Sequence, residues 1–229
     1  MENLDNKKIY ATISADIVGS TSLPVVQLYA IQQSMKQFIE DLEYYESGNY
    51  CWGRVVHGDS IEIVMDKPAH VLRAALLLKC KVKTYYKRYK GSRFDKYRIR
   101  IAMGVGEMRI SDKEKDMMDG EAIYLSGRTL NSMSGKKEVE NMVFVSKHQL
   151  THALDIIAKL ADACISSATS NQCNLVYHKL LGKSSDDISK IVMNKENKPI
   201  SVSAVNKQLV SAQWQSLIQA VNYFEKIEF

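Results

Sequence analysis

The hydrophobic pattern changes its period once along the 229-residue chain, near Gln149. Before that point, short apolar runs and alternating apolar residues, both typical of strands, are separated by stretches with helical spacing. Beyond it the spacing is helical throughout, in the segments 149–169, 171–182, 185–194, 201–212 and 213–227. We therefore predict two domains, an α+β domain over residues 1–148 and a small all-α domain over residues 149–229.

Strands of the α+β domain are predicted at 8–18, 50–57, 60–65, 97–106 and 142–145. Helices are predicted after Pro24, after Asp66 and at 120–134. The order βαββαβ followed by αβ favours a ferredoxin-like fold with an antiparallel or mixed sheet and its helices on one face. The fourth strand carries Gly104 and Gly106 on one face, where small residues let a ligand or a second subunit approach the backbone.

The bulk composition is that of an ordinary globular protein, with 45% hydrophobic and 25% charged residues. The first eight residues lack the apolar centre of a signal peptide, and no segment reaches the ~20 apolar residues of a membrane span. Four scattered cysteines without CxxC spacing are typical of reduced thiols. We therefore expect a cytoplasmic protein with no membrane partner, and its net charge of +5 permits an anionic partner.

Lysine and arginine are concentrated between Lys79 and Arg100, where Asp95 is the only acidic residue and aromatic residues are interspersed. Such a segment is typical of a nucleic-acid contact, since clustered cations release counterions and aromatic rings stack on bases. It is also typical of a helix C-terminus followed by a solvated loop, which is the interpretation we prefer. The sequence leaves both interpretations open.

Two aspartates each lie where a predicted strand meets a turn. Asp16 ends the first strand shortly before Gly19-Ser20-Thr21, and Asp59 follows Gly58 in the turn between the second and third strands. Carboxylates on neighbouring strands suit Mg²⁺, which completes its shell with water and phosphate oxygens. If the two residues converge, the pattern predicts a site for a divalent cation and a phosphorylated ligand.

These residues and two others also have purely structural interpretations. Asp16 can accept backbone amides of the following turn and cap the next helix, and Asp59 after a glycine is typical of a plain hairpin turn. His57 is typical of a half-buried strand histidine. Arg128 can pair with a carboxylate on an exposed helix face.

Four segments resemble, in the same order, the motifs of the class III nucleotidyl cyclase catalytic domain. They are Asp16–Thr21, His57-Gly58-Asp59, Arg100–Glu107 and Gly120–Arg128, and the resemblance covers residues 8–146. The fold implied is the nucleotidyl-cyclase-like form of the βαββαβ domain. The same segments, together with the carboxy-terminal part, are also similar to the SatD family of bacterial proteins.

The cyclase resemblance implies a role for each matching residue. Asp16 and Asp59, with the backbone of Ile17, match the ligands of Mg²⁺ or Mn²⁺ ions held against a triphosphate. Arg128 matches the catalytic arginine that steadies the transition-state phosphate. The nucleotide contacts implied are Gly19, Ser20, Thr21, Tyr124 and Arg128. Because the family's site forms across a homodimer interface, the resemblance implies a homodimer that binds a nucleoside triphosphate or a related phosphorylated ligand.

Two positions depart from the cyclase pattern. Tyr124 stands where cyclases carry an asparagine that orients the ribose, and Val55 stands where they carry a lysine that reads the base. Arg54 is adjacent to Val55, but a one-residue step along a strand turns a side chain to the opposite face. The departures favour metal and phosphate binding over turnover by the cyclase route.

Residues 171–214 resemble a helix-turn-helix. The segment 174–181 matches the support helix, and the segment 200–209 matches the recognition helix. The predicted DNA contacts are Ser201, which is also the expected N-cap, and Ser203, Asn206 and Lys207. Met193 to Pro199 forms a longer connection than the usual turn of 3–4 residues. A helical bundle used for protein contacts or dimerisation therefore stays open.

Three functions are compatible with these patterns. The first is a regulatory protein in which a Mg-nucleotide-binding, cyclase-like sensor domain is coupled to a DNA-binding helix-turn-helix. The second is an active nucleotidyl cyclase with an accessory helical module, and the third is a ligand-free protein-interaction adaptor. The retained Asp16, Asp59 and Arg128 favour the first over the third, and the altered Val55 and Tyr124 favour it over the second.

Overall fold

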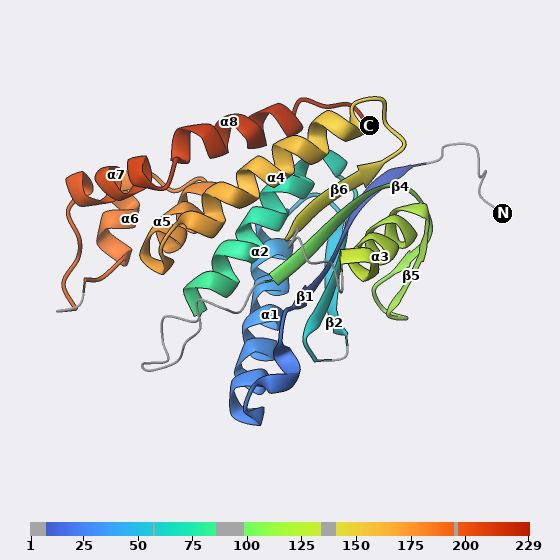
Figure 1. The fold of residues 1–229 in the computed structure, drawn as a ribbon, viewed down its shortest axis with the longest axis horizontal. Coiled ribbons are helices and arrows are strands. Elements are labelled where there is room, and N and C mark those ends of the chain that lie inside the picture. Colours follow the sequence, from blue (N-terminus) through green and yellow to red (C-terminus); the bar gives the residue numbers. More distant parts are fainter. Residues whose placement is uncertain (1–7, 57, 86–98, 134–140, 195–196) are drawn as a thin grey trace.

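The computed structural model describes residues 8–56, 58–85, 99–133, 141–194 and 197–229, which are built around a six-stranded sheet (Figure 1). The strands are β1 (Ile9–Ile17), β2 (Cys51–Val56), β3 (Ser60–Met65), β4 (Ile99–Asp112), β5 (Met117–Gly120) and β6 (Met142–Ser146). Their order is β2-β3-β1-β4-β5, and β6 pairs in parallel with β4, whereas the other pairs are antiparallel. The predicted α+β fold with βαββαβ order and a mixed sheet is confirmed.

β1 is the central strand, between β3 and β4. Its register places Asp16 beside Ser60 on one side and Arg100 on the other. Every residue from Ala11 to Ala15 is buried, as expected of an uncharged strand that is covered on both faces. The end of this strand therefore brings Asp16 next to two neighbouring strands at once.

Helices cover both faces of the sheet, and the prediction that they lie on one face is wrong. α1 (Val25–Tyr45) and α2 (Val71–Tyr85) lie on one face, and α3 (Glu121–Met133) lies on the other, as Figure 1 shows. On that second face the hydroxyl oxygen of Ser126 is 2.9 Å from that of Thr12 and 2.8 Å from that of Ser14. Polar side chains at these buried positions need a partner, and α3 supplies it.

The glycines of β4 make room for α3, so the prediction that a ligand or second subunit approaches there is wrong. A Cβ atom on Gly104 would lie 2.4 Å from the carbonyl oxygen of Ala122 and 2.8 Å from the amide nitrogen of Ser126. A Cβ atom on Gly106 would lie 2.8 Å from a carboxylate oxygen of Glu121. The missing side chains let the α3 backbone rest directly on the strand.

β4 continues to Asp112, beyond its predicted end at residue 106, and turns back into β5, which the sequence did not predict. The far end of this hairpin reaches β2 and α1. The carbonyl oxygen of Ser111 accepts a hydrogen bond from Tyr50 at 2.8 Å, and its hydroxyl accepts one from Trp52 at 3.0 Å. Contacts beyond the sheet ladder therefore stabilise the extension.

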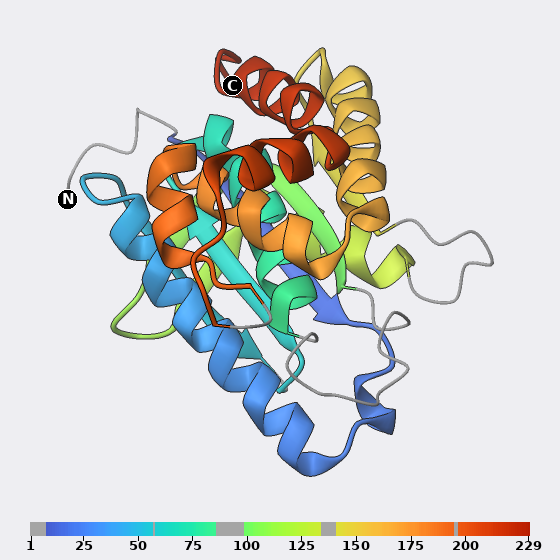
Figure 2. The same cartoon turned by 90° about the vertical axis from the view of Figure 1, so that its left-hand side faces the viewer.

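The carboxy-terminal part is helical, with elements close to the predicted segments. They are α4 (Thr151–Ser167), α5 (Ser170–Leu180), α6 (Ser185–Ile191), α7 (Val202–Ser211) and α8 (Trp214–Phe224). α5 packs along α2, and Figure 2 shows it in front of that helix. The buried residues of both parts form one hydrophobic core. The boundary near residue 149 stays a prediction.

Two ion pairs join α2 to the helical part. Lys79 pairs with Asp162 of α4, and both residues are buried. Arg73 binds both carboxylate oxygens of Glu225 at 2.5 and 3.0 Å, and donates to the carbonyl oxygen of Leu180 at 2.6 Å. Among the described helices, none combines the length and the apolar character that crossing a membrane requires.

Candidate functional site

Asp16 and Arg100 form an ion pair across the β1–β4 strand pair. The Nε atom of Arg100 donates to Oδ1 of Asp16 over 2.8 Å, and its Nη2 atom donates to Oδ2. Only 16% of the Arg100 side chain and 19% of the Asp16 side chain are exposed. The hydrogen bond to Asp16 raises the pKa of Arg100, partial burial opposes this increase, and the charges of Asp16 and Asp59 add to it. Arg100 therefore stays positively charged, and it lies in the electrostatic field of two carboxylates.

Asp59 lies in the tight turn between β2 and β3, beside the end of β1. Its carbonyl oxygen accepts a hydrogen bond from the amide of Ile17 over 3.1 Å. Its carboxylate accepts hydrogen bonds from the hydroxyls of Ser20 and Ser60, the latter over 3.3 Å. Asp59 is therefore a turn residue, as its structural interpretation expected, and the structure also brings it to the same end of the sheet as Asp16. We call these two residues the aspartate pair.

The turn after β1 is not capped by Asp16, so that structural interpretation is wrong. Gly19 has φ of 77° and precedes the 3₁₀ helix η1 (Ser20–Ser22), which has no side-chain cap. Ser20 is buried against Asp59, whereas Gly19 and Thr21 are exposed. Of these three residues, Ser20 binds a carboxylate of the aspartate pair, and nucleotide contact by all three stays a prediction.

The chemistry of this end of the sheet fits a hard divalent cation. Two carboxylates and the backbone carbonyl of Ile17 are oxygen donors, and Mg²⁺ commonly takes only one or two protein carboxylates. Within the described ranges, no group of three or more His, Cys, Asp or Glu side chains gathers to hold a metal. A metal at the aspartate pair would therefore complete its shell with water or ligand oxygens.

Tyr124 and Arg128 form a cluster on the outer side of α3. The guanidinium carbon of Arg128 lies 5.6 Å from the centre of the Tyr124 ring, and 43% of Tyr124 is exposed. The Tyr124 hydroxyl donates to Asp119 and accepts a hydrogen bond from Arg109 over 3.1 Å. No interaction recorded for the described residues joins this cluster to the aspartate pair. Within one chain, the predicted metal and nucleotide residues thus fall into two separate groups.

Arg54 faces the same side of the sheet as Asp16. The register sets Arg54 opposite Glu62, and Glu62 opposite Ser14, so these three side chains share the face of Asp16. Val55 faces the other way and packs against the core. The prediction that Arg54 and Val55 face opposite sides of the sheet is therefore confirmed, and Arg54 is the one that shares the face of Asp16. Arg54 binds Glu62 through two nitrogens, at 2.9 and 2.7 Å.

Arg100 is the residue of this site to which the sequence assigned no role. A signal was present, because Arg100 lies on the face of its strand opposite to the apolar Ile99 and Ile101. Antiparallel pairing of the first and fourth strands sets this face against that of Asp16. The sequence pattern does not give the register of the two strands. Only the register shows that these two residues lie directly opposite each other.

Part of the basic segment and His57 lie outside the described residues, which omit 57 and 86–98. The described lysines of the segment lie on α2 and make contacts within the protein. Lys79 pairs with Asp162, Lys81 pairs with Asp41 at 3.1 Å, and Lys83 donates to two carbonyl oxygens of α4. For this part of the segment, the contacts support the helix-end interpretation.

The predicted DNA contacts lie on α7 and its N-cap. All four of them are exposed: Ser201, Ser203, Asn206 and Lys207. The Ser201 hydroxyl accepts a hydrogen bond from the amide of Ala204 over 3.2 Å, so Ser201 is the N-cap, as predicted. The long connection between α6 and α7 contains an antiparallel bridge between Met193 and Pro199. This bridge pairs the two ends of the connection, whose residues 195–196 lie outside the described residues.

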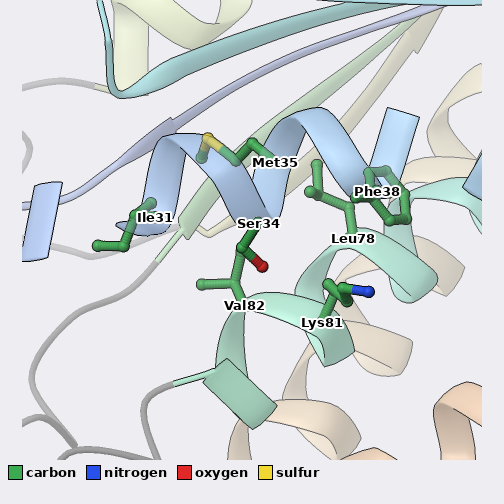
Figure 3. Close-up of a pocket in the computed structure, with 7 residues that line it drawn as sticks. All are labelled: Ile31, Ser34, Met35, Phe38, Leu78, Lys81 and Val82. Carbon is green, nitrogen blue, oxygen red and sulfur yellow. The ribbon is translucent and has the colours of Figure 1, made fainter. Parts of the chain in front are cut away.

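A small cavity lies between α1 and α2 (Figure 3). Its volume of about 10 Å³ is comparable to that needed for one water molecule. Its lining residues are Ile31, Ser34, Met35, Phe38, Leu78, Lys81 and Val82. This cavity is a packing gap and is too small for a nucleotide.

No protein-family model matches the sequence, and no curated protein matches it. Among solved structures, the chain is similar to the adenylyl cyclase CyaB from P. aeruginosa, at 12% identity and a TM-score of 0.43, over 64% of this chain and 79% of that chain. It is also similar to a bacterial light-regulated adenylyl cyclase, at 12% identity and a TM-score of 0.38, over 59% of this chain and 74% of that chain. At this identity and TM-score neither similarity says anything about activity. The likeness to the SatD family remains a prediction.

Proposed function

We propose that this chain is a regulatory protein whose α+β part binds a nucleoside triphosphate, or a related phosphorylated ligand, together with Mg²⁺ or Mn²⁺. The observation that carries the proposal is the convergence of the aspartate pair. The Ile17–Asp59 backbone hydrogen bond fixes the end of β1 beside the turn between β2 and β3, and Arg100 adds a cation on the other side of Asp16, in the field of both carboxylates. Asp16, Asp59 and the Ile17 carbonyl would hold the metal, which when bound neutralises phosphate charge.

A homodimer is part of the proposal. Arg128 and Tyr124 are exposed on the outer side of α3 and are not joined to the aspartate pair of the same chain. A ligand held by the aspartate pair of one chain can meet this cluster from a second copy. We therefore expect a protein that is dimeric when it binds its ligand, and a monomer that binds a nucleotide with full affinity would contradict this.

Binding rather than turnover is the preferred form of the function. Val55 packs against the core and carries no polar group to read a base, and the Tyr124 hydroxyl is held by Asp119 and Arg109. An active nucleotidyl cyclase is the second candidate, because the Arg128 guanidinium remains at the surface beside an aromatic ring. Product formation in the binding samples separates the two candidates.

The test is calorimetry with ATP, GTP, CTP and UTP, each with and without Mg²⁺ or Mn²⁺. We expect metal-dependent binding of at least one nucleotide by the wild type and its loss in Asp59→Asn. Asp186→Asn, an exposed carboxylate of α6, is the matched control and should bind as the wild type does. If no combination shows metal-dependent binding, the nucleotide proposal fails and a ligand-free adaptor is left.

We further propose that the helical part contacts DNA through α7, which presents Ser203, Asn206 and Lys207 to solvent. Lys207→Ala should weaken binding on all DNA sequences and reduce the slope of log affinity against log salt by about 1. Lys226→Ala, an exposed lysine beyond α8, is the control and should leave the slope unchanged. A wild type without salt-sensitive DNA affinity at low salt would rule out this contact and favour a protein-binding module.

A further inference from the structure

We infer that Arg100 is the resident cation of the aspartate pair and that a divalent metal must displace it from Asp16. This inference rests on the proposed metal site. The guanidinium donates to both carboxylate oxygens of Asp16 and lies in the field of Asp59. Two carboxylates at one strand end repel each other unless a cation compensates them. Arg100 supplies that compensation within the chain itself.

The geometry makes Arg100 and a metal competitors. A metal ligated by Asp16 would sit beside the guanidinium, and cations that close together in a half-buried site repel strongly. Coordination by Asp16 therefore requires at least one of its two hydrogen bonds to Arg100 to open. The wild type should accordingly bind a metal weakly when no ligand adds oxygen donors.

Arg54 provides a matched comparison on the same face of the sheet. Two of its nitrogens donate to one carboxylate oxygen of Glu62, and its Nη1 atom is 3.4 Å from a carboxylate oxygen of Asp116. Its side chain is also partly exposed, at 28%. Arg54→Gln thus removes a cation from two other carboxylates, those of Glu62 and Asp116. It tests whether any two carboxylates that lose their arginine bind a metal.

The experiment measures Mn²⁺ binding to the full chain without nucleotide, by calorimetry and by the electron paramagnetic resonance signal of free Mn²⁺. We expect Arg100→Gln to bind Mn²⁺ about tenfold more tightly than the wild type, because the competing charge is gone. Arg54→Gln should show no such gain. In Arg100→Gln/Asp16→Asn the gain should disappear, because the carboxylate that the metal takes over is missing.

Thermal unfolding gives a second, independent measurement. Without metal, Arg100→Gln should unfold at a lower temperature than the wild type, and Mn²⁺ should restore its stability. Arg54→Gln should also be less stable but should gain nothing from Mn²⁺. If Arg100→Gln does not fold, Arg100→Lys is used. A lysine keeps the positive charge but cannot donate to both carboxylate oxygens of Asp16 as the guanidinium does. We therefore expect Arg100→Lys to gain less Mn²⁺ affinity than Arg100→Gln.

The inference is overturned if Arg100→Gln, or Arg100→Lys in its place, binds Mn²⁺ no more tightly than the wild type. This outcome is distinct from failure of the proposed function, which requires that the wild type bind no nucleotide with metal. If Arg100→Gln binds Mn²⁺ more tightly but the wild type binds no nucleotide, the displacement of Arg100 by a metal is supported and the nucleotide-binding proposal is rejected. If the wild type binds a nucleotide but Arg100→Gln does not bind Mn²⁺ more tightly, the proposed function is supported and the displacement of Arg100 is rejected.

Discussion

The guanidinium of Arg100 donates hydrogen bonds to both carboxylate oxygens of Asp16 across the β1–β4 pair, at the end of the sheet that also holds Asp59. The pair follows from register alone, since Asp16 and Arg100 lie directly opposite each other on antiparallel strands. Directly opposed residues of opposite charge stabilise a strand pair. The same contact therefore has a structural role in the folded chain and a place in the proposed ligand site.

Replacement of Asp16 by asparagine should reveal the structural role. Asp16→Asn keeps the shape but leaves the partly buried Arg100 without a negative partner, so we expect a loss of about 2 kcal/mol in the free energy of unfolding. Urea unfolding at neutral pH measures it. Asp186→Asn, at an exposed position of α6, should change stability by less than about 0.5 kcal/mol. Equal stability of Asp16→Asn and the wild type would show that the ion pair contributes nothing to folding.

The contact between α3 and β4 gives a second prediction. In Gly104→Ala the new Cβ atom would meet the backbone of α3 at 2.4 and 2.8 Å, so the helix must shift, and we expect a loss of about 2 kcal/mol. Gly127→Ala, on α3 itself, meets no atom within 4 Å and should gain about 0.5 kcal/mol, since alanine favours a helix. Denaturant unfolding of both variants measures the contrast. Similar stabilities of the two alanine variants would mean that α3 does not rest on β4 as described.

Local pattern was sufficient to predict most elements of this fold. The uncharged run that begins after Lys8 and the alternation in 60–65 predicted β1 and β3 closely, because burial fixes which residues a strand can carry. The position of α3 was not predictable in the same way. Gly104 signalled a close approach to the strand, but only the assembled structure shows that the approaching backbone belongs to α3.

α2 carried a signal that the sequence interpretation missed. Its residues from Ala74 to Leu78 are all apolar and all buried, and a helix that is hydrophobic on every side lies inside a protein. A helix at the edge of an independent domain would need only one apolar stripe. The remaining sides of α2 are covered by the helical part, which the chain supplies after residue 149.

Truncation at the predicted boundary tests how far the two parts depend on each other. The fragment 1–148 would expose the sides of α2 that α4 and α5 cover, and would leave Lys79 and Arg73 without Asp162 and Glu225. We expect its thermal midpoint to fall by at least ~10 °C, or its cooperative transition to disappear. Binding of a hydrophobic dye should increase. The fragment 149–229, added separately, is the control and should reverse these changes if it can dock.

An independent α+β domain predicts the opposite result for the same fragment. In that case 1–148 would unfold cooperatively within a few degrees of the full chain, and the second fragment would have no effect. The contacts around α2 favour dependence, and the abrupt change of sequence period near Gln149 favours independence. Measurement of the fragment decides between them.

His178 on α5 makes the stability of the helical part dependent on pH. Burial lowers the pKa of His178 to about 4, and the positive charges of Lys183 and Lys81 act in the same direction. In the unfolded chain the pKa is about 6.5. Between these values the unfolded state binds more protons, so stability is complete above pH 6.5 and falls as the pH drops towards 4.

We expect this histidine to cost about 1 kcal/mol of stability between pH 7 and pH 5, after allowance for solvent screening of a partly exposed group. Urea unfolding at pH 7, 6 and 5 measures the slope. His178→Gln cannot take up the proton, so its stability should fall less steeply over this range. His152→Gln, at an exposed position of α4, should keep the wild-type slope. If His178→Gln and the wild type lose stability in parallel, protonation of His178 is not what weakens the fold at low pH.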